Sequence, residues 1–161
     1  MAETGFSMRW RISHVIAVVV VLCPFVAART IHVANDGPAD YATIQAAIDA
    51  ASNGDTVLVA PGTYPGDGNR DIDFRGKAIT VESENGSESC VIDCQGSRQQ
   101  HHRGFYFHSG ERAEALVSGF TVTNGYADYG GGICCDGSSP TIKDCTIMGN
   151  QSSNSYVPQW G

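Results

Sequence analysis

Three polar residues are the best candidates for chemistry in this sequence: Glu82, His108 and Asp136. Each follows a short alternation of apolar and polar residues, and the two intervals between them are nearly equal. If these segments stack as neighbouring strands, the three side chains form one outward column with a spacing of about 4.8 Å. A histidine between two carboxylates is favoured in its protonated form, which suits acid–base catalysis or the binding of a sugar or a cation. The alternative interpretation is a surface ion-pair ladder, which contributes little energy.

Two other groups of residues contain possible metal ligands, but neither provides enough of them for a complete metal site. His101, His102 and Arg103 form a basic turn. Asp128 precedes Gly130–Gly132 in a loop that could offer backbone oxygens to calcium, although a calcium site normally takes several acidic ligands. We therefore predict no resident cofactor and no metal site, and calcium is the one ion that merits a titration.

Five cysteines follow residue 28: Cys90, Cys94, Cys134, Cys135 and Cys145. On one extended strand Cys90 and Cys94 would lie about 13 Å apart, and a disulfide needs less than about 7 Å between Cα atoms. Cys134 and Cys135 lack a second Cys or His pair at the spacing of zinc ligands. We expect Cys94, Cys135 and Cys145 to be small buried apolar residues.

Short strands must position these side chains. Runs of alternating residues separated by Gly, Asn, Asp and Ser predict strands over residues 30–34, 56–60, 78–83, 90–95, 105–109, 116–123, 132–135 and 141–148. One helix is predicted over 41–52, where Ile44, Ala47, Ile48 and Ala51 form a single apolar stripe. A helix with one thin apolar face suits a lid over the end of a strand body.

The predicted strands recur at intervals of roughly 25 residues, which is typical of a β-solenoid. Four inward ladders follow from this spacing: Val57, Ile79, Phe105, Ile133; Val59, Val81, Phe107, Cys135; Ile72, Ile92, Phe120, Cys145; and Phe74, Cys94, Val122, Ile147. The sequence thus predicts an all-β chain, a right-handed parallel β-helix of about four or five coils with an N-terminal capping α-helix. An antiparallel sandwich is the alternative.

The predicted organisation has four parts. Residues 1–28 have the layout of a secretory signal peptide, since arginines precede the apolar run 15–26 and Val26-Ala27-Ala28 offers a cleavage point. A strand and capping helix over 29–54, repeats over 55–150 and an irregular, truncated tail over 151–161 complete the chain. We expect a secreted or cell-surface protein without a stable membrane span after cleavage. The formal net charge of −7 argues against nucleic acid as a partner.

Several segments resemble pectin-lyase-like right-handed parallel β-helix proteins of the bacterial surface or secreted type. TIQAAIDAASNGDTVLVAPGTY (43–64) resembles their N-terminal cap, and GKAITVESENG (76–86), GFTVTNG (119–125) and GGGICCDGSSPTIKDCTI (130–147) resemble their repeats. The resemblance implies the fold and an extracellular setting. The Asn-Thr-Asp, Asp-Asp, Gly-His-Asp and Arg-Ile-Lys segments of glycoside hydrolases with this fold are missing. The nearest acids stand in Asp71-Ile72-Asp73 and Asn53-Gly54-Asp55.

The sequence therefore favours a non-enzymatic surface or extracellular scaffold, or a weak carbohydrate-binding module. The alternative is a polysaccharide lyase or glycoside hydrolase that acts through Glu82, His108 and Asp136. The partner we expect is a polysaccharide or a cell-surface glycan. The C-terminal coil, which has no predicted cap, offers a second route of association.

Overall fold

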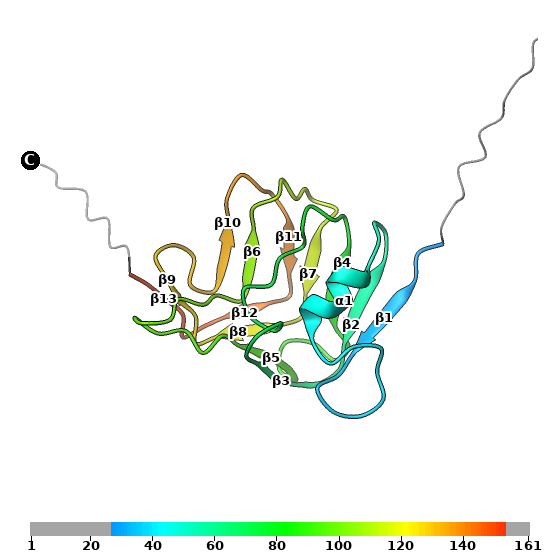
Figure 1. Ribbon diagram of the computed structural model, residues 1–161, viewed down its shortest axis with the longest axis horizontal. Coiled ribbons are helices and arrows are strands. Elements are labelled where there is room, and N and C mark those ends of the chain that lie inside the picture. Colours follow the sequence, from blue (N-terminus) through cyan, green and yellow to red (C-terminus); the bar gives the residue numbers. More distant parts are fainter. Residues whose placement is uncertain (1–26, 154–161) are drawn as a thin grey trace, which may run out of the picture.

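The computed structural model describes residues 27–153 (Figure 1). Most of the predicted signal peptide, residues 1–26, and most of the predicted tail, residues 154–161, lie outside the described residues. In the described part, no helix is long and apolar enough to cross a membrane.

The described chain forms a parallel β-solenoid of about five turns, which confirms the predicted parallel β-helix. Its strands are β1 (Thr30–Val33), β2 (Thr56–Val59), β3 (Gly62–Pro65), β4 (Thr80–Ser83), β5 (Cys90–Asp93), β6 (Phe105–Phe107), β7 (Leu116–Ser118), β8 (Thr121–Thr123), β9 (Tyr126–Ala127), β10 (Ile133–Cys135), β11 (Thr141–Lys143), β12 (Thr146–Ile147) and β13 (Gln151–Ser152). Every pairing between these strands is parallel, which excludes the antiparallel sandwich.

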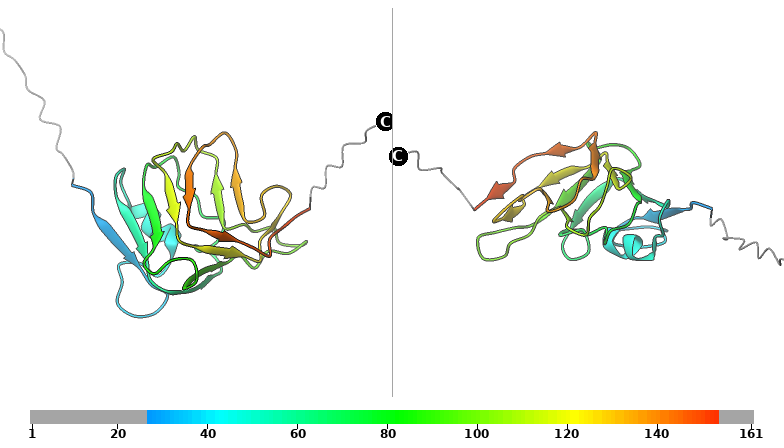
Figure 2. Two further views of the ribbon diagram at one scale, coloured as in Figure 1. Left: turned by 180° about the vertical axis from the view of Figure 1, so that it is seen from behind. Right: turned by 90° about the horizontal axis from the view of Figure 1, so that it is seen from above.

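The strands stack into four sheets, each made of strands from successive turns of the chain (Figure 2). The long sheet has the order β1-β2-β4-β7-β11, and the four-stranded sheet has the order β12-β8-β5-β3. Two smaller sheets pair β6 with β10 and β9 with β13. Because neighbouring strands come from different turns, no single turn buries its apolar face without the next one.

The core is a set of apolar ladders inside the turns. Val57 pairs with Ile31 on one side and Val81 on the other, and Val81 pairs with Val117. Tyr64, Ile92 and Val122 form the equivalent ladder in the four-stranded sheet. These residues are all buried, and they stack without intervening polar groups.

Four phenylalanines fill the space between the sheets. The ring centroids of Phe74 and Phe107 lie 5.0 Å apart in an edge-to-face arrangement, and those of Phe105 and Phe120 lie 6.0 Å apart. Aromatic pairs at these distances add to the free energy gained by burying their area.

The predicted register between turns is wrong in part. Val81 stacks on Val57 and Val117, not on Val59 and Phe107, and Ile92 stacks on Val122, not on Phe120. The pairs Phe105 with Ile133 and Phe107 with Cys135 are confirmed. The physical reason is that the turns differ in length, since the chain from Val81 to Val117 is half as long again as the chain from Val57 to Val81. A uniform repeat therefore cannot place the strands that follow a long turn.

Helix α1 (Ile44–Ala50) is shorter than the predicted helix over 41–52. The Thr43 side chain accepts a hydrogen bond from the backbone of the first turn, and the buried face packs against β1 and β2. The Lys77 ammonium donates to the carbonyl oxygens of Ile48, Asp49 and Ala51 at 2.7, 2.9 and 2.8 Å. A lysine from the following turn thus satisfies the carbonyl groups that a helix C-terminus leaves open.

The last described turn leaves apolar side chains exposed. Ile142, Ile147 and Met148 are 41%, 47% and 59% exposed, because β11 and β12 are the outermost strands of their sheets. The strand β13 lies in the region for which the sequence predicts an irregular tail, and it pairs with β9.

Candidate functional site

The outer face of the β6–β10 sheet brings together most of the polar residues that could act on a ligand. Tyr106 on β6 lies beside Cys134 on β10, and the next outward positions are His108 and Asp136. The backbone N–H of Asp136 donates to the carbonyl oxygen of Phe107 at 2.8 Å, which fixes the two strands in this register. His108 and Asp136 therefore directly follow two adjacent strands and are neighbours, as the sequence predicts.

Glu82 does not belong to this group. It lies on β4 in the long sheet, where it pairs with Leu58 on β2 and Ser118 on β7. The column of Glu82, His108 and Asp136 is thus corrected to a pair, because the long turn between β4 and β7 carries β6 into a different sheet.

Asp73, and not Glu82, is the acid whose side chain lies beside His108. Its neighbour Ile72 makes a parallel bridge with Phe105, so Asp73 lies at the outward position next to β6. One carboxylate oxygen of Asp73 is 3.4 Å from Nε2 of His108. His108 therefore has one acid, Asp73 from the Asp71-Ile72-Asp73 segment, at ion-pair distance, and Asp136 occupies the equivalent position after the adjacent strand.

The ring of Tyr106 contacts two neighbouring side chains, the His108 ring and the Arg103 guanidinium. The His108 ring stacks on it with a centroid distance of 4.2 Å, and the Arg103 guanidinium lies 4.5 Å from its centroid. These contacts hold the phenol ring in place and cover much of its surface. Tyr106 therefore orients its neighbours more than it offers a free ring to a ligand.

A groove of about 460 Å³ continues this face toward the loop after β9. We call it the tyrosine groove, and it is lined by Arg103, Tyr106, Asp128, Tyr129, Cys134, Cys135 and Asp136. Tyr129 is 65% exposed, so its ring, unlike that of Tyr106, is open to a ligand. The groove thus combines one free aromatic ring, one guanidinium and two carboxylates.

The loop residues considered for metal binding have other contacts. Asp128 accepts a hydrogen bond from the Ser153 hydroxyl at 2.6 Å, and Nδ1 of His101 lies 3.7 Å from the same carboxylate. Nδ1 of His102 is 2.6 Å from a carboxylate oxygen of Asp71. Across residues 27–153, no group of three or more His, Cys, Asp or Glu side chains could hold a metal ion.

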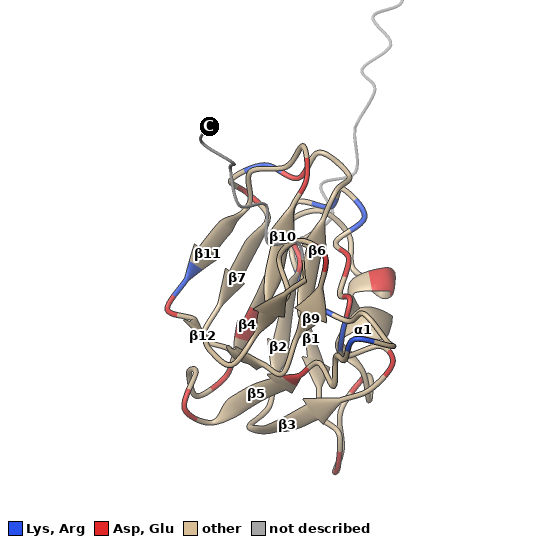
Figure 3. Ribbon diagram, turned by 90° about the vertical axis from the view of Figure 1, so that its left-hand side faces the viewer, with Lys and Arg blue, Asp and Glu red and all other residues tan. Residues whose placement is uncertain are grey.

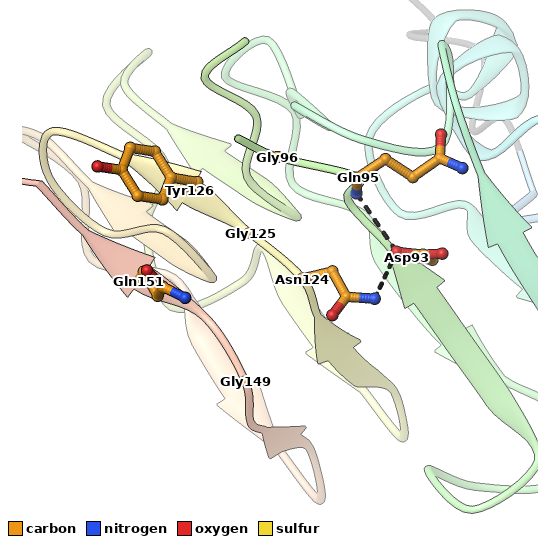
Figure 4. Close-up of a pocket in the computed structure, with 8 residues that line it drawn as sticks. All are labelled: Asp93, Gln95, Gly96, Asn124, Gly125, Tyr126, Gly149 and Gln151. Atoms are coloured by element: carbon orange, nitrogen blue, oxygen red, sulfur yellow. Dashed lines mark hydrogen bonds between the residues drawn. The ribbon is translucent and has the colours of Figure 1, made fainter. Parts of the chain in front are cut away.

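A second depression, of about 360 Å³, lies where the four-stranded sheet ends (Figure 4). The Asn124 amide donates to Asp93 at 2.9 Å, and the Gln95 backbone donates to the same carboxylate oxygen at 3.3 Å. Gln95, Asn124 and Gly149 all have positive φ, at 51°, 56° and 66°, so the same left-handed corner recurs in three turns. This depression is polar and is part of the corner that ends the sheet, so it is a weaker ligand site than the tyrosine groove.

Two buried carboxylates have structural rather than chemical surroundings. Asp55 and Glu111 are each 2% exposed, and both accept several hydrogen bonds. The backbone N–H of Ser52 lowers the pKa of Asp55, and this effect together with that of Arg29 outweighs the opposing effect of burial. Burial raises the pKa of Glu111, but hydrogen bonds from the Gly76 backbone and the Ser138 hydroxyl bring it below its usual value. Both groups are therefore held as carboxylates inside the protein.

The cysteines differ from the prediction at the last turns. Cys90 and Cys94 are buried, and burial raises the pKa of each thiol to about 12. Cys135 is exposed and Cys145 is partly exposed, so the expectation that both are buried is wrong. No described strand stacks beyond β10, which leaves the inward position of Cys135 uncovered. All five cysteines among the described residues are free thiols.

Comparison with known proteins gives no assignment. No protein-family model matches the chain, and no curated protein matches it with significant similarity. The function must therefore be argued from the fold and from the tyrosine groove.

Proposed function

We propose that this chain is an exported β-helix module that binds a neutral polysaccharide weakly through the tyrosine groove and has no enzymatic activity. The observation that carries the proposal is the exposed Tyr129 ring beside Arg103, Asp128 and Asp136 in one groove. A tyrosine ring offers an apolar surface to the C–H face of a sugar, and charged groups beside it form strong hydrogen bonds with hydroxyls.

The charge of the protein favours a neutral ligand. The chain has a formal net charge of −7, and acidic residues are scattered over the helix, the strands and the loops in the view of Figure 3. A polyanionic polysaccharide would be repelled by this field over the distance of a Debye length. Within the described part of the chain, Arg103 is the only lysine or arginine that lines the tyrosine groove, and two acids accompany it there.

Two features of the sequence support an extracellular role. The segments quoted above resemble pectin-lyase-like β-helix proteins of the surface or secreted type, and the N-terminal segment 1–28 has the layout of a signal peptide. An elongated stack of turns is also a suitable scaffold, since it presents side chains at a regular spacing along each outer face. We propose a polysaccharide or a cell-surface glycan as the partner on these grounds.

The binding test uses immobilised glycans. A panel with neutral and acidic polysaccharides identifies ligands, and calorimetry then compares the wild type with Tyr129→Ala. We expect at least a tenfold loss of affinity, about 1.4 kcal/mol, when the exposed ring is removed. Met148→Ala is the matched control, because Met148 is similarly exposed on a different turn. Equal binding by Tyr129→Ala and wild type would refute the groove as the site.

A polysaccharide lyase or glycoside hydrolase is the second candidate, favoured by one observation. His108 lies 3.4 Å from Asp73 and beside the position of Asp136, so an imidazole and two carboxylates share one face. The assay measures unsaturated or reducing sugar ends released from the polysaccharides that bind. We expect no release above that of His108→Ala; release that depends on His108 would replace the binding module with an enzyme.

A further inference from the structure

The buried carboxylate of Asp55 is bound by Arg29, the first residue after the predicted signal peptide. The backbone N–H of Arg29 donates to one Asp55 oxygen at 3.0 Å, and the Arg29 guanidinium donates to the other at 3.0 Å. The Ser52 backbone supplies a further hydrogen bond at 2.9 Å. The carbonyl oxygen of Arg29 in turn accepts from Thr56 on β2 at 2.9 Å. Arg29 is therefore anchored to the fold through its backbone N–H, its carbonyl and its side chain.

The residues immediately before Arg29 are open to solvent. Ala27 and Ala28 are exposed, and β1 begins only at Thr30. Exposed segments of this kind are preferred sites of proteolytic cleavage, and the Ala28–Arg29 bond is open to a protease before the Arg29 N–H binds Asp55. Val26 and Ala28 also provide the small residues that a signal peptidase requires at the third and first positions before the cut.

We propose that the chain is cleaved between Ala28 and Arg29, and that the new α-ammonium group of Arg29 is bound by the carboxylate of Asp55. Water cleaves the peptide bond: its oxygen becomes part of the new carboxylate of Ala28, and both of its protons end on the Arg29 nitrogen, which becomes an ammonium. The catalyst is an endopeptidase that processes exported proteins, so this inference rests on the export proposed above.

Cleavage changes the contact between the Arg29 nitrogen and Asp55 from an amide hydrogen bond into an ion pair, the second one that this carboxylate forms. The carboxylate is 2% exposed, so solvent screens the new charge pair weakly on that side. Three other titratable or charged groups surround the new ammonium. The Arg29 guanidinium, itself bound to Asp55, is repulsive, and Asp40 and Tyr41 line the same depression of about 410 Å³. Asp40 adds a second negative charge, so acids outnumber the one neighbouring cation.

The first experiment identifies the N-terminus. The full chain is expressed in a host that exports it, and the exported protein is analysed by N-terminal sequencing and intact mass. We expect Arg29 as the first residue. Exported protein that begins at another residue would overturn the proposed pairing of the Arg29 ammonium with Asp55 but would support export. Uncleaved protein that stays inside the cell would overturn both the pairing and the proposed export.

The second experiment measures what the α-ammonium contributes. One purified chain begins at Arg29 and another at Ala27, so that the second keeps an amide at Arg29. We expect the first to unfold about 3 °C higher at neutral pH. This difference should vanish above about pH 10, where an α-amino group is neutral. Asp55→Asn should abolish it, and Asp36→Asn, an exposed acid in the loop after β1, should not. If Asp55→Asn does not fold, the pH dependence alone decides, and a difference that persists above pH 10 overturns the proposal.

Discussion

Glu111 connects three successive turns of the solenoid, and its removal should weaken all three. One carboxylate oxygen accepts from the Gly76 backbone at 2.8 Å. The other accepts from the Ser109 backbone at 2.9 Å and from the Ser138 hydroxyl at 2.7 Å. Glu111→Gln keeps the shape of the side chain but replaces one acceptor oxygen with an NH₂ group. We expect this substitution to be among the most destabilising single changes outside the apolar core.

The NH₂ group introduced by Glu111→Gln can replace either carboxylate oxygen, and the smaller cost arises where it replaces the oxygen that accepts only one hydrogen bond, from Gly76. If the new NH₂ group faces Gly76, one hydrogen bond to a charged acceptor is lost, which costs about 1.5–3 kcal/mol. The Gly76 N–H and the NH₂ group then face each other inside the protein, which costs at least about 1 kcal/mol more. We therefore expect a loss of about 3 kcal/mol in the free energy of unfolding, a large fraction of the total for an ordinary domain.

Urea unfolding monitored by circular dichroism measures this loss. Glu114→Gln is the control, because Glu114 is exposed and three residues away, and its change should stay within about 0.5 kcal/mol. The pKa of Glu111 is lower in the folded protein than in the unfolded chain, so the unfolded chain binds the proton more tightly. The wild-type advantage over Glu111→Gln should thus be full above about pH 6 and shrink below about pH 4. Equal midpoints for the Glu111→Gln and Glu114→Gln proteins would refute this reasoning.

Three further outcomes test other parts of the structure. Lys77→Met should lower the free energy of unfolding by about 2 kcal/mol in urea titrations, since three helix carbonyls lose their donor. In the native protein at pH 8, Cys135 should react with a thiol reagent, and Cys90 and Cys94 should react only after unfolding, which peptide mass mapping would show. Ile147→Ser should reduce self-association in sedimentation experiments, because it removes an exposed apolar side chain from the last described turn; unchanged sedimentation would contradict this role.

The fold could be predicted from the sequence because its signals are local. Alternating residues with Gly, Asn and Asp between them indicate short strands, and the lack of long helices between the strands favours stacked turns over a doubly wound sheet. The α1 stripe of Ile44, Ala47 and Ile48 is likewise visible in the sequence, and those residues are buried. The contribution of Lys77 to the helix end was not predictable, since this lysine belongs to the following turn of the chain.

The candidate site was only half predictable, because it depends on the lengths of the turns. His108 and Asp136 follow strands β6 and β10, which are adjacent in space. The triplets Ile72-Asp73-Phe74 and Phe105-Tyr106-Phe107 share one pattern, apolar, polar, apolar, and this likeness could have identified Asp73 as the neighbour of β6. The assumption of a uniform repeat concealed this likeness, because that repeat aligned Phe105 with Ile79 and not with Ile72. Tyr129 lies in a loop without periodicity, so no pattern in the sequence placed it in the groove.

The corrected register can be tested directly with pairs of cysteines on outward positions. In the structure Glu82 pairs with Ser118 across β4 and β7, so their Cα atoms lie within the roughly 5 Å that separates neighbouring strands. A disulfide tolerates separations up to about 7 Å, so Glu82→Cys with Ser118→Cys should crosslink under mild oxidation. A uniform repeat would instead place Glu82 beside His108. The structure places β4 and β6 in different sheets, so Glu82→Cys with His108→Cys should fail to crosslink. Mass mapping of the linked peptides separates these bonds from any made by the native thiols. Crosslinking of the second pair in place of the first would return Glu82 to the column with His108 and would move Asp73 away from the site.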